Sequence, residues 1–142
     1  MNLDKLRFDK LTYCGIRDID SFEQQMIEKN NIRVLDVPNL IKYIKSLNGP
    51  VHISFDVDAL DPQLVDSTGT AVPDGLDSED VQRIIATALE ADKLVSLDVV
   101  EFNKDLGNAE DSLLAVKKVF DTEQESDISD SNTESDTDRN SS

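Results

Sequence analysis

The sequence is poor in the residue types that build disulfide frameworks and histidine-rich metal sites. Its 142 residues include one cysteine, one histidine and no tryptophan. The single Cys14 excludes a disulfide within the chain, and its place in an apolar run favours a small buried side chain. No apolar run approaches the ~18 residues of a membrane span, and residues 1–10 lack the apolar stretch of a signal peptide. We therefore expect a cytoplasmic protein.

Basic residues are also scarce, with 14 Lys and Arg against 30 Asp and Glu and a net charge of −16. Residues 122–142 carry −6 of this charge, so the remainder of the chain still carries −10. Nucleic acids and anionic membrane surfaces attract clustered Lys and Arg, so neither is an expected partner. An acidic surface suits a cationic ligand instead.

The composition changes near residue 121 and divides the chain into two parts. Residues 122–142 are rich in Ser and Asp and contain one aliphatic residue, which predicts a disordered acidic tail. Residues 1–121 contain the apolar periodicities of a single folded domain. We expect the function to reside in this domain.

Strand-like and helix-like segments alternate in the domain, which predicts an α/β fold with a partial parallel sheet flanked by helices. The expected strands are 11–16, 33–37, 51–57 and 94–102, and the expected helices are 21–29, 39–46, 78–90 and 109–121. The strand at 94–102 is mostly apolar and includes three β-branched valines, which predicts a buried strand. A long loop is expected at 59–76.

Ligands of parallel sheets bind outside the carboxyl ends of the strands. Asp18 and Asp20 follow the first expected strand, Asp56 and Asp58 end the third, and Glu101 ends the fourth. The chemically suggestive acids of the domain therefore fall on one rim of the sheet.

Asp56 and Asp58 stand in the run SFDVDALDP at 54–62, directly after an alternating apolar segment. Two carboxylates two residues apart share one face of a strand and suit Mg²⁺ or Mn²⁺. The alternative is a strand that runs into an acidic turn without a metal. Asp61, which precedes Pro62, is expected to start a turn.

Three segments resemble the arginase branch of the ureohydrolases. They are GIRDIDSFE at 15–23, SFDVDALDP at 54–62 with STGTAVPDGL at 67–76, and LDVVEFN at 97–103. They occur in the order found in that family and span about residues 10–121. The first segment is more similar to arginases than to agmatinases. The resemblance implies the C-terminal part of an arginase-like fold.

The family hydrolyses L-arginine to L-ornithine and urea with two manganese ions, held by four aspartates and two histidines. The resemblance implies that Asp56 and Asp58 are metal ligands and that Thr70 lies in the substrate region. It places Asp20, helped by Asp18 and Glu23, at the α-ammonium of L-arginine or a related guanidino compound, and Glu101 at the guanidinium. Asp20 and Glu23 alternatively cap the helix that begins near Ser21, and Glu101 is alternatively an exposed acid.

The family's histidine ligands and its histidine proton shuttle lie upstream of the matched region. The one histidine here, His52, stands at a position that the family does not use for metal. The chain is therefore expected to be inactive alone and to need the N-terminal half, either as a complementary chain or through an incomplete gene model; a homo-oligomer is a further possible partner. Two alternatives remain: a non-enzymatic remnant or interaction module that retains the ureohydrolase fold, and an unrelated acidic scaffold.

The chain also departs from the family pattern in the long loop and after the last strand. Asp66 replaces a usual Pro, Asp74-Gly75 replaces two glycines, and Lys104 replaces a Pro. Aspartate tolerates a positive φ better than most residues, so we expect Asp74 to adopt the glycine conformation.

Overall fold

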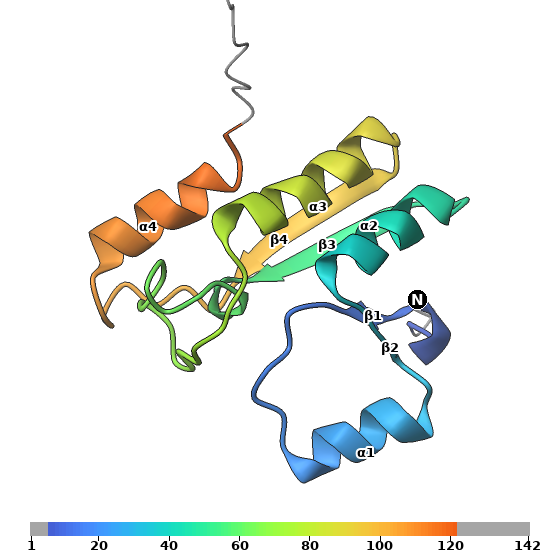
Figure 1. Cartoon of the computed structure of the whole chain (residues 1–142), viewed down its shortest axis with the longest axis horizontal. Helices are drawn as coiled ribbons and strands as arrows, with labels where there is room; N and C mark the ends of the chain where they lie inside the picture. Colours follow the sequence, from blue (N-terminus) through green and yellow to red (C-terminus); the bar gives the residue numbers. More distant parts are fainter. Residues whose placement is uncertain (1–5, 122–142) are drawn as a thin grey trace, which may run out of the picture.

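The computed structural model describes residues 6–121 and confirms an α/β fold of parallel sheets flanked by helices (Figure 1). The strands are β1 (Thr12–Tyr13), β2 (Arg33–Val34), β3 (Val51–Asp56) and β4 (Leu94–Val100), and the helices are α1 (Ser21–Lys29), α2 (Val37–Ser46), α3 (Ser78–Glu90) and α4 (Ala109–Lys118). The expected tail at 122–142 lies outside the described residues. Between residues 6 and 121, no helix combines the length and apolar character needed to cross a membrane.

The four strands form two separate parallel pairs, β1–β2 and β3–β4, instead of one sheet. The first pair is two residues long on each side, shorter than the expected strands at 11–16 and 33–37. Gly15, with φ of +73°, turns the chain after β1, and Asp36 starts a helix directly after β2. The β3–β4 pair is the larger sheet: Val51 pairs with Leu94, and after a register shift of one residue the pairing runs from His52 and Ser96 to Asp56 and Val100.

Each helix begins at a side chain that accepts a backbone N–H bond. These N-caps are Asp20, Asp36, Asp77 and Asn108. Pro38, which directly follows the expected strand at 33–37, lies in the first turn of α2. The first turn tolerates proline because its N–H groups have no partner inside the helix.

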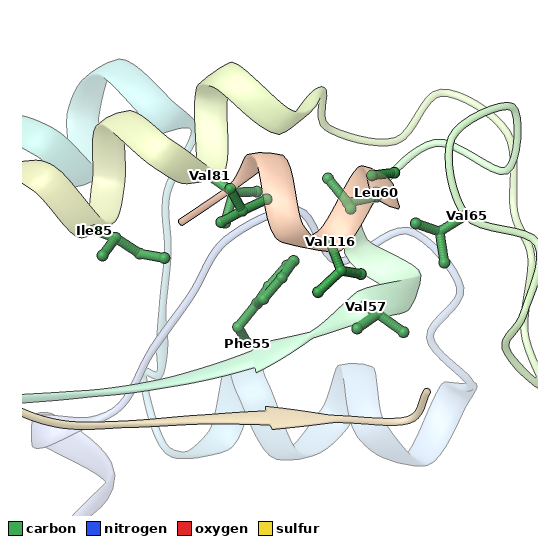
Figure 2. Close-up of a cluster of buried hydrophobic side chains, with 9 residues drawn as sticks. Phe55, Val57, Leu60, Val65, Val81, Ile85 and Val116 are labelled. Atoms are coloured by element: carbon green, nitrogen blue, oxygen red, sulfur yellow. The ribbon is translucent and has the colours of Figure 1, made fainter. Parts of the chain in front are cut away.

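The core lies between the β3–β4 sheet and the helices on one face of it. One cluster joins this sheet and the following turns to α3 and α4, and Figure 2 shows its side chains converging from these elements. It contains Phe55, Val57, Leu60, Val65, Val81, Ile85, Ala115, Val116 and Val119. A second cluster packs α2 against α3, with half-buried Cys14 at its edge. Burial raises the pKa of the Cys14 thiol, in keeping with the expected small buried side chain.

Among residues 6–121, nothing covers the other face of the β3–β4 sheet, and the prediction of a buried strand at 94–102 is wrong. No residue of β4 is buried, and Val95 is 67% exposed. On this face His52 Nδ1 lies 2.7 Å from Ser96 Oγ, and His52 Nε2 lies 3.5 Å from Asp98 Oδ2. Parallel sheets are normally covered on both faces, but the described helices pack against one.

Residues 6–35, which we call the arm, pack more lightly than residues 36–121, which we call the body. In the arm Ile32 alone is buried, and α1 has no buried residue. Figure 1 shows α1 apart from α2, α3 and α4, at the far end of the segments that follow β1 and precede β2. The arm therefore reaches the body mainly through β1 and the residues that follow it.

Candidate metal and substrate site

The carboxylates of Asp56 and Asp58 are placed by the end of β3. Phe55 and Val57 point into the core, so the alternation along the strand leaves Asp56 and Asp58 at its surface end. Asp56 is the last residue of β3, and Asp58 lies in a short 3₁₀ turn, Val57–Ala59. Asp56 Oδ1 accepts the N–H of Asp58 at 3.1 Å, which ties the turn to the strand.

Glu101 lies at the same end of the sheet. Asp56 pairs in register with Val100, so Glu101 follows directly beyond the paired residues. Glu101 has φ of +64°, a left-handed conformation that is costly for a residue with a side chain. The expectation that Asp58 and Glu101 share one rim is confirmed. Asp18 and Asp20 were expected on the same rim, but they follow β1, which belongs to the separate β1–β2 pair and not to the β3–β4 sheet.

The electrostatics of Asp58 reflect these neighbours. Its pKa is raised by partial burial, then by the adjacent Asp56 carboxylate, and further by Glu101, while Arg17 acts in the opposite direction. Ionised carboxylates that repel one another on a rim attract a divalent cation.

The two aspartates fit manganese as a pair of oxygen ligands, although the described residues do not complete a site. Carboxylate oxygens are suitable ligands for Mn²⁺. Within residues 6–121, however, there is no group of three or more His, Cys, Asp or Glu placed to hold a metal ion. The pair therefore does not form such a group by itself.

Asp20 and Glu23 form a capping box at the start of α1. Asp20 Oδ1 accepts the N–H groups of Phe22 and Glu23 at 2.8 Å each, and Glu23 Oε2 accepts the N–H of Asp20 at 2.9 Å. The helix-cap alternative is thus present in the structure, and a substrate role of these acids stays a prediction. Asp18 is exposed on the segment before the cap.

The long loop is fixed at its two ends, next to the rim. Asp61 accepts the N–H of Gln63 at 3.0 Å and that of Gly75 at 3.1 Å, which confirms its expected role in a turn. These backbone N–H groups lower the pKa of Asp61, and the Gln63 bond contributes most. Asp74 has φ of +64°, as expected for a residue in a glycine position. Thr70, the predicted substrate contact, is exposed on this loop.

The unusual Asp66 fastens the loop to α4. Its Oδ1 accepts the N–H of Asn108 at 2.8 Å and the hydroxyl of Ser112 at 3.1 Å. A Cβ at Gly107 would collide with this carboxylate, so a glycine there makes the contact possible. An acid in place of proline thus gains hydrogen bonds that proline does not offer.

Sequence reasoning missed two residues near the rim. The guanidinium of Arg17 donates to backbone carbonyls of the turn after β3, including that of Asp58 at 2.6 Å. Thr68 is 5% exposed, and its hydroxyl has no hydrogen-bond partner among the described residues. Arg17 belongs to the segment GIRDIDSFE, of which only the acidic residues were considered as site residues. No spacing rule predicts that Thr68 is buried within a loop.

Comparisons with known proteins agree with the three sequence segments. The model of the arginase family matches residues 2–122. The arginase of Glaciozyma antarctica is 38% identical over 115 residues, which cover 72% of this chain and 33% of that protein. The chain thus spans about a third of the length of the curated relatives that it matches.

Solved structures show the same relationship in three dimensions. The crystal structure of Entamoeba histolytica arginase in complex with L-ornithine superposes with a TM-score of 0.62 and 29% identity, covering 77% of this chain and 42% of that one. A hypothetical agmatinase from Burkholderia thailandensis gives a TM-score of 0.64 and 28% identity, with 79% and 37% covered. The fold is therefore shared by enzymes named for two different guanidino substrates.

Proposed function

Because this chain belongs to the arginase family, we propose that it forms part of a manganese-dependent ureohydrolase site that converts L-arginine and water to L-ornithine and urea. The observation that carries the proposal is the rim: Asp56 ends β3, Asp58 lies in the turn that follows, and Glu101 directly follows β4 beside them. The complex of the Entamoeba histolytica arginase with L-ornithine supports this choice of substrate class.

In this proposal each candidate residue binds either manganese or one part of the substrate. Asp56 and Asp58 hold manganese, which supplies Lewis-acid chemistry when bound. Glu101 accepts two parallel hydrogen bonds from the guanidinium, a geometry that orients the substrate. Asp20, with Asp18 and Glu23, attracts the α-ammonium, and Thr70 borders the substrate.

We further propose that the 142-residue chain does not hydrolyse arginine alone. Two aspartates are fewer ligands than a pair of manganese ions needs. The mutual repulsion of the ions requires further anionic ligands, and borderline metals also favour imidazole ligands. A complementary N-terminal chain that carries histidines, or a homo-oligomer, completes the site. Urea production in arginine metabolism and a cytoplasmic location follow from this proposal and stay predictions.

An interaction module without catalysis is the second candidate. The absence of a three-ligand metal group within residues 6–121 favours it. Such a module would keep the fold and bind a ureohydrolase partner. It would do so without a requirement for Asp56 or Asp58.

The test is urea release from L-arginine and from agmatine in the presence of Mn²⁺. The chain is assayed alone and after mixing with the part of the Glaciozyma antarctica arginase that the chain does not match. We expect no urea from the chain alone and arginine-dependent urea from the mixture. Asp56→Asn and Asp58→Asn should abolish this activity.

Two outcomes would contradict the proposal. Urea release by the chain alone, well above that of an Asp56→Ala, Asp58→Ala variant, would show that it is a complete enzyme. A stable mixed complex that releases no urea would favour the interaction module. Preference for agmatine would keep the reaction class and change the substrate.

A further inference from the structure

The side chain of Arg17 joins the arm to both ends of the long loop. Its Nη2 donates to the carbonyl oxygens of Asp58 at 2.6 Å and Val72 at 2.9 Å. Its Nη1 donates to the carbonyl of Ala59 at 2.9 Å, and longer bonds reach Gly15 at 3.1 Å and Leu60 at 3.5 Å. One side chain thus binds the carbonyls of the consecutive residues 58–60, where the 3₁₀ turn ends, and also the carbonyl of Val72 in the second half of the long loop.

This arrangement needs an arginine. A guanidinium is planar and permanently charged, and it presents five N–H donors in a rigid fork. A lysine offers three donors around one nitrogen and cannot span carbonyls that face both terminal nitrogens of Arg17. Because these nitrogens are occupied by backbone carbonyls, the guanidinium acts on the protein and is not free to bind a substrate carboxylate.

We propose that Arg17 is a positioning residue of the candidate metal site, which acts through the backbone of Asp58 to aim the Asp58 carboxylate. The inference rests on the metal role proposed for Asp58 and extends it to a residue that contacts no ligand. Asp58 lies in a turn of three residues, so the orientation of its peptide groups determines where its carboxylate points. The carbonyls of Asp58, Ala59 and Leu60 are the groups that Arg17 holds.

Arg33 provides a matched control because it also reaches from the arm to the body. Its guanidinium lies 4.3 Å from the centre of the Tyr43 ring, and Nη1 donates to the Tyr43 hydroxyl at 2.8 Å. Its hydrogen bonds go to Tyr43 and Thr12, away from the turn after β3. An Arg33→Lys variant therefore weakens an arm contact and leaves the candidate site untouched.

The first readout is amide hydrogen exchange of the full chain without metal. The N–H of Asp61 bonds to the carbonyl of Leu76 at 3.0 Å, and that of Leu76 bonds to Ala59 at 2.8 Å, so both report on the turn. We expect Arg17→Lys to speed exchange of these amides about tenfold, because bonds to a charged donor are among the stronger ones. Arg33→Lys should change them by less than roughly twofold, and unchanged exchange in α3 shows that each variant is folded.

The second readout is the apparent affinity for Mn²⁺, measured by paramagnetic broadening of the same amides. Groups that orient metal ligands typically contribute about tenfold or more in affinity, and we expect a loss of this size for Arg17→Lys but not for Arg33→Lys. Equal affinities in the two variants would overturn the positioning role, even if exchange becomes faster. Unchanged exchange in Arg17→Lys would overturn it as well.

The same measurements distinguish failure of the proposed metal role of Asp58 from failure of the positioning role of Arg17. If the parent chain does not bind Mn²⁺, or if Asp58→Asn binds it equally well, then the metal role of Asp58 is wrong. The exchange experiment still decides whether Arg17 orders the turn. Failure of the metal role and failure of the positioning role therefore give different results.

Discussion

The arm and the body differ in what holds their acidic residues in place. In the body, Asp56 and Asp58 follow Phe55, which is 5% exposed, and flank Val57, which is fully buried. In the arm, Asp20 and Glu23 begin a helix with no buried residue, on which Phe22 is 68% exposed. The candidate metal ligands thus lie on a packed core, and the acids proposed for the α-ammonium, Asp20 and Glu23, lie at the start of a helix held by local hydrogen bonds.

This difference predicts two levels of local stability. Segments with few buried contacts open with low free energy, whereas core elements open with the whole fold. We expect amides of α1 to exchange well before those of β3 and α3. The comparison implies a rigid rim that carries Asp56, Asp58 and Glu101, and a more mobile arm that carries Asp20 and Glu23.

The largest expected effect compares two phenylalanines. Phe55→Ala removes a buried ring from the first core cluster and should lower the free energy of unfolding by about 3–5 kcal/mol. Phe22→Ala in α1 should change it by less than about 0.5 kcal/mol. Urea unfolding followed by circular dichroism measures both, and similar losses would show that the arm is packed as firmly as the body.

A second comparison tests the loop next to the rim with two glycines. A Cβ at Gly75 would collide with the backbone of Leu60 and Asp61, so Gly75→Ala should cost about 1–3 kcal/mol. A Cβ at Gly69 meets nothing within 4 Å, and Gly69→Ala should be neutral or slightly stabilising. If Gly75→Ala unfolds at the same urea concentration as the parent chain, then Gly75 does not lie as close to the backbone of Leu60 and Asp61 as the structure indicates.

A smaller effect is expected at the start of α1. Asp20→Ala removes the acceptor of two N–H bonds and should destabilise α1 by about 1 kcal/mol, whereas Asp20→Asn retains a good cap. Because α1 buries nothing, the loss should appear as faster amide exchange in α1 without a change in global unfolding. A lowered urea midpoint for Asp20→Ala would mean that α1 belongs to the cooperative unit of the body.

Local patterns in the sequence predicted the elements whose structure depends on local interactions. The bounds of α1 and α3 are as expected, because a cap precedes each helix and apolar residues recur along α3 at helical spacing. The alternation after Val51 predicted Asp56 and Asp58 at the end of the strand that became β3. Glu101 is distant in sequence, but the carboxyl ends of parallel strands meet at one edge, so the rim shared with Asp58 was also predictable. The positive φ of Asp74 also followed from the chemistry of its side chain.

Long-range packing was not predictable in the same way. The exposure of Val95 depends on which face the helices cover, and residue types within β4 do not carry that information. Arg17 was missed because its partners are carbonyls more than forty residues away, and any residue type supplies a carbonyl. The contact of Asp66 with Asn108 and Ser112 likewise appears only once α4 is placed.

The most direct test of the metal role is Mn²⁺ binding by the full chain and three isosteric variants. Asp56→Asn and Asp58→Asn remove proposed ligands, and Asp56→Asn retains an oxygen for the bond to the Asp58 N–H. Asp61→Asn removes the same charge from a neighbouring turn and is the control for general electrostatic attraction.

The account predicts that Mn²⁺ broadens amides around Asp56 and Asp58 in the parent chain and in Asp61→Asn. It predicts at least about a tenfold weaker effect in Asp56→Asn and Asp58→Asn, since each loses a charged ligand. Equal weakening in all three variants would show attraction by acidic charge alone. That result would contradict the assignment of Asp56 and Asp58 as manganese ligands.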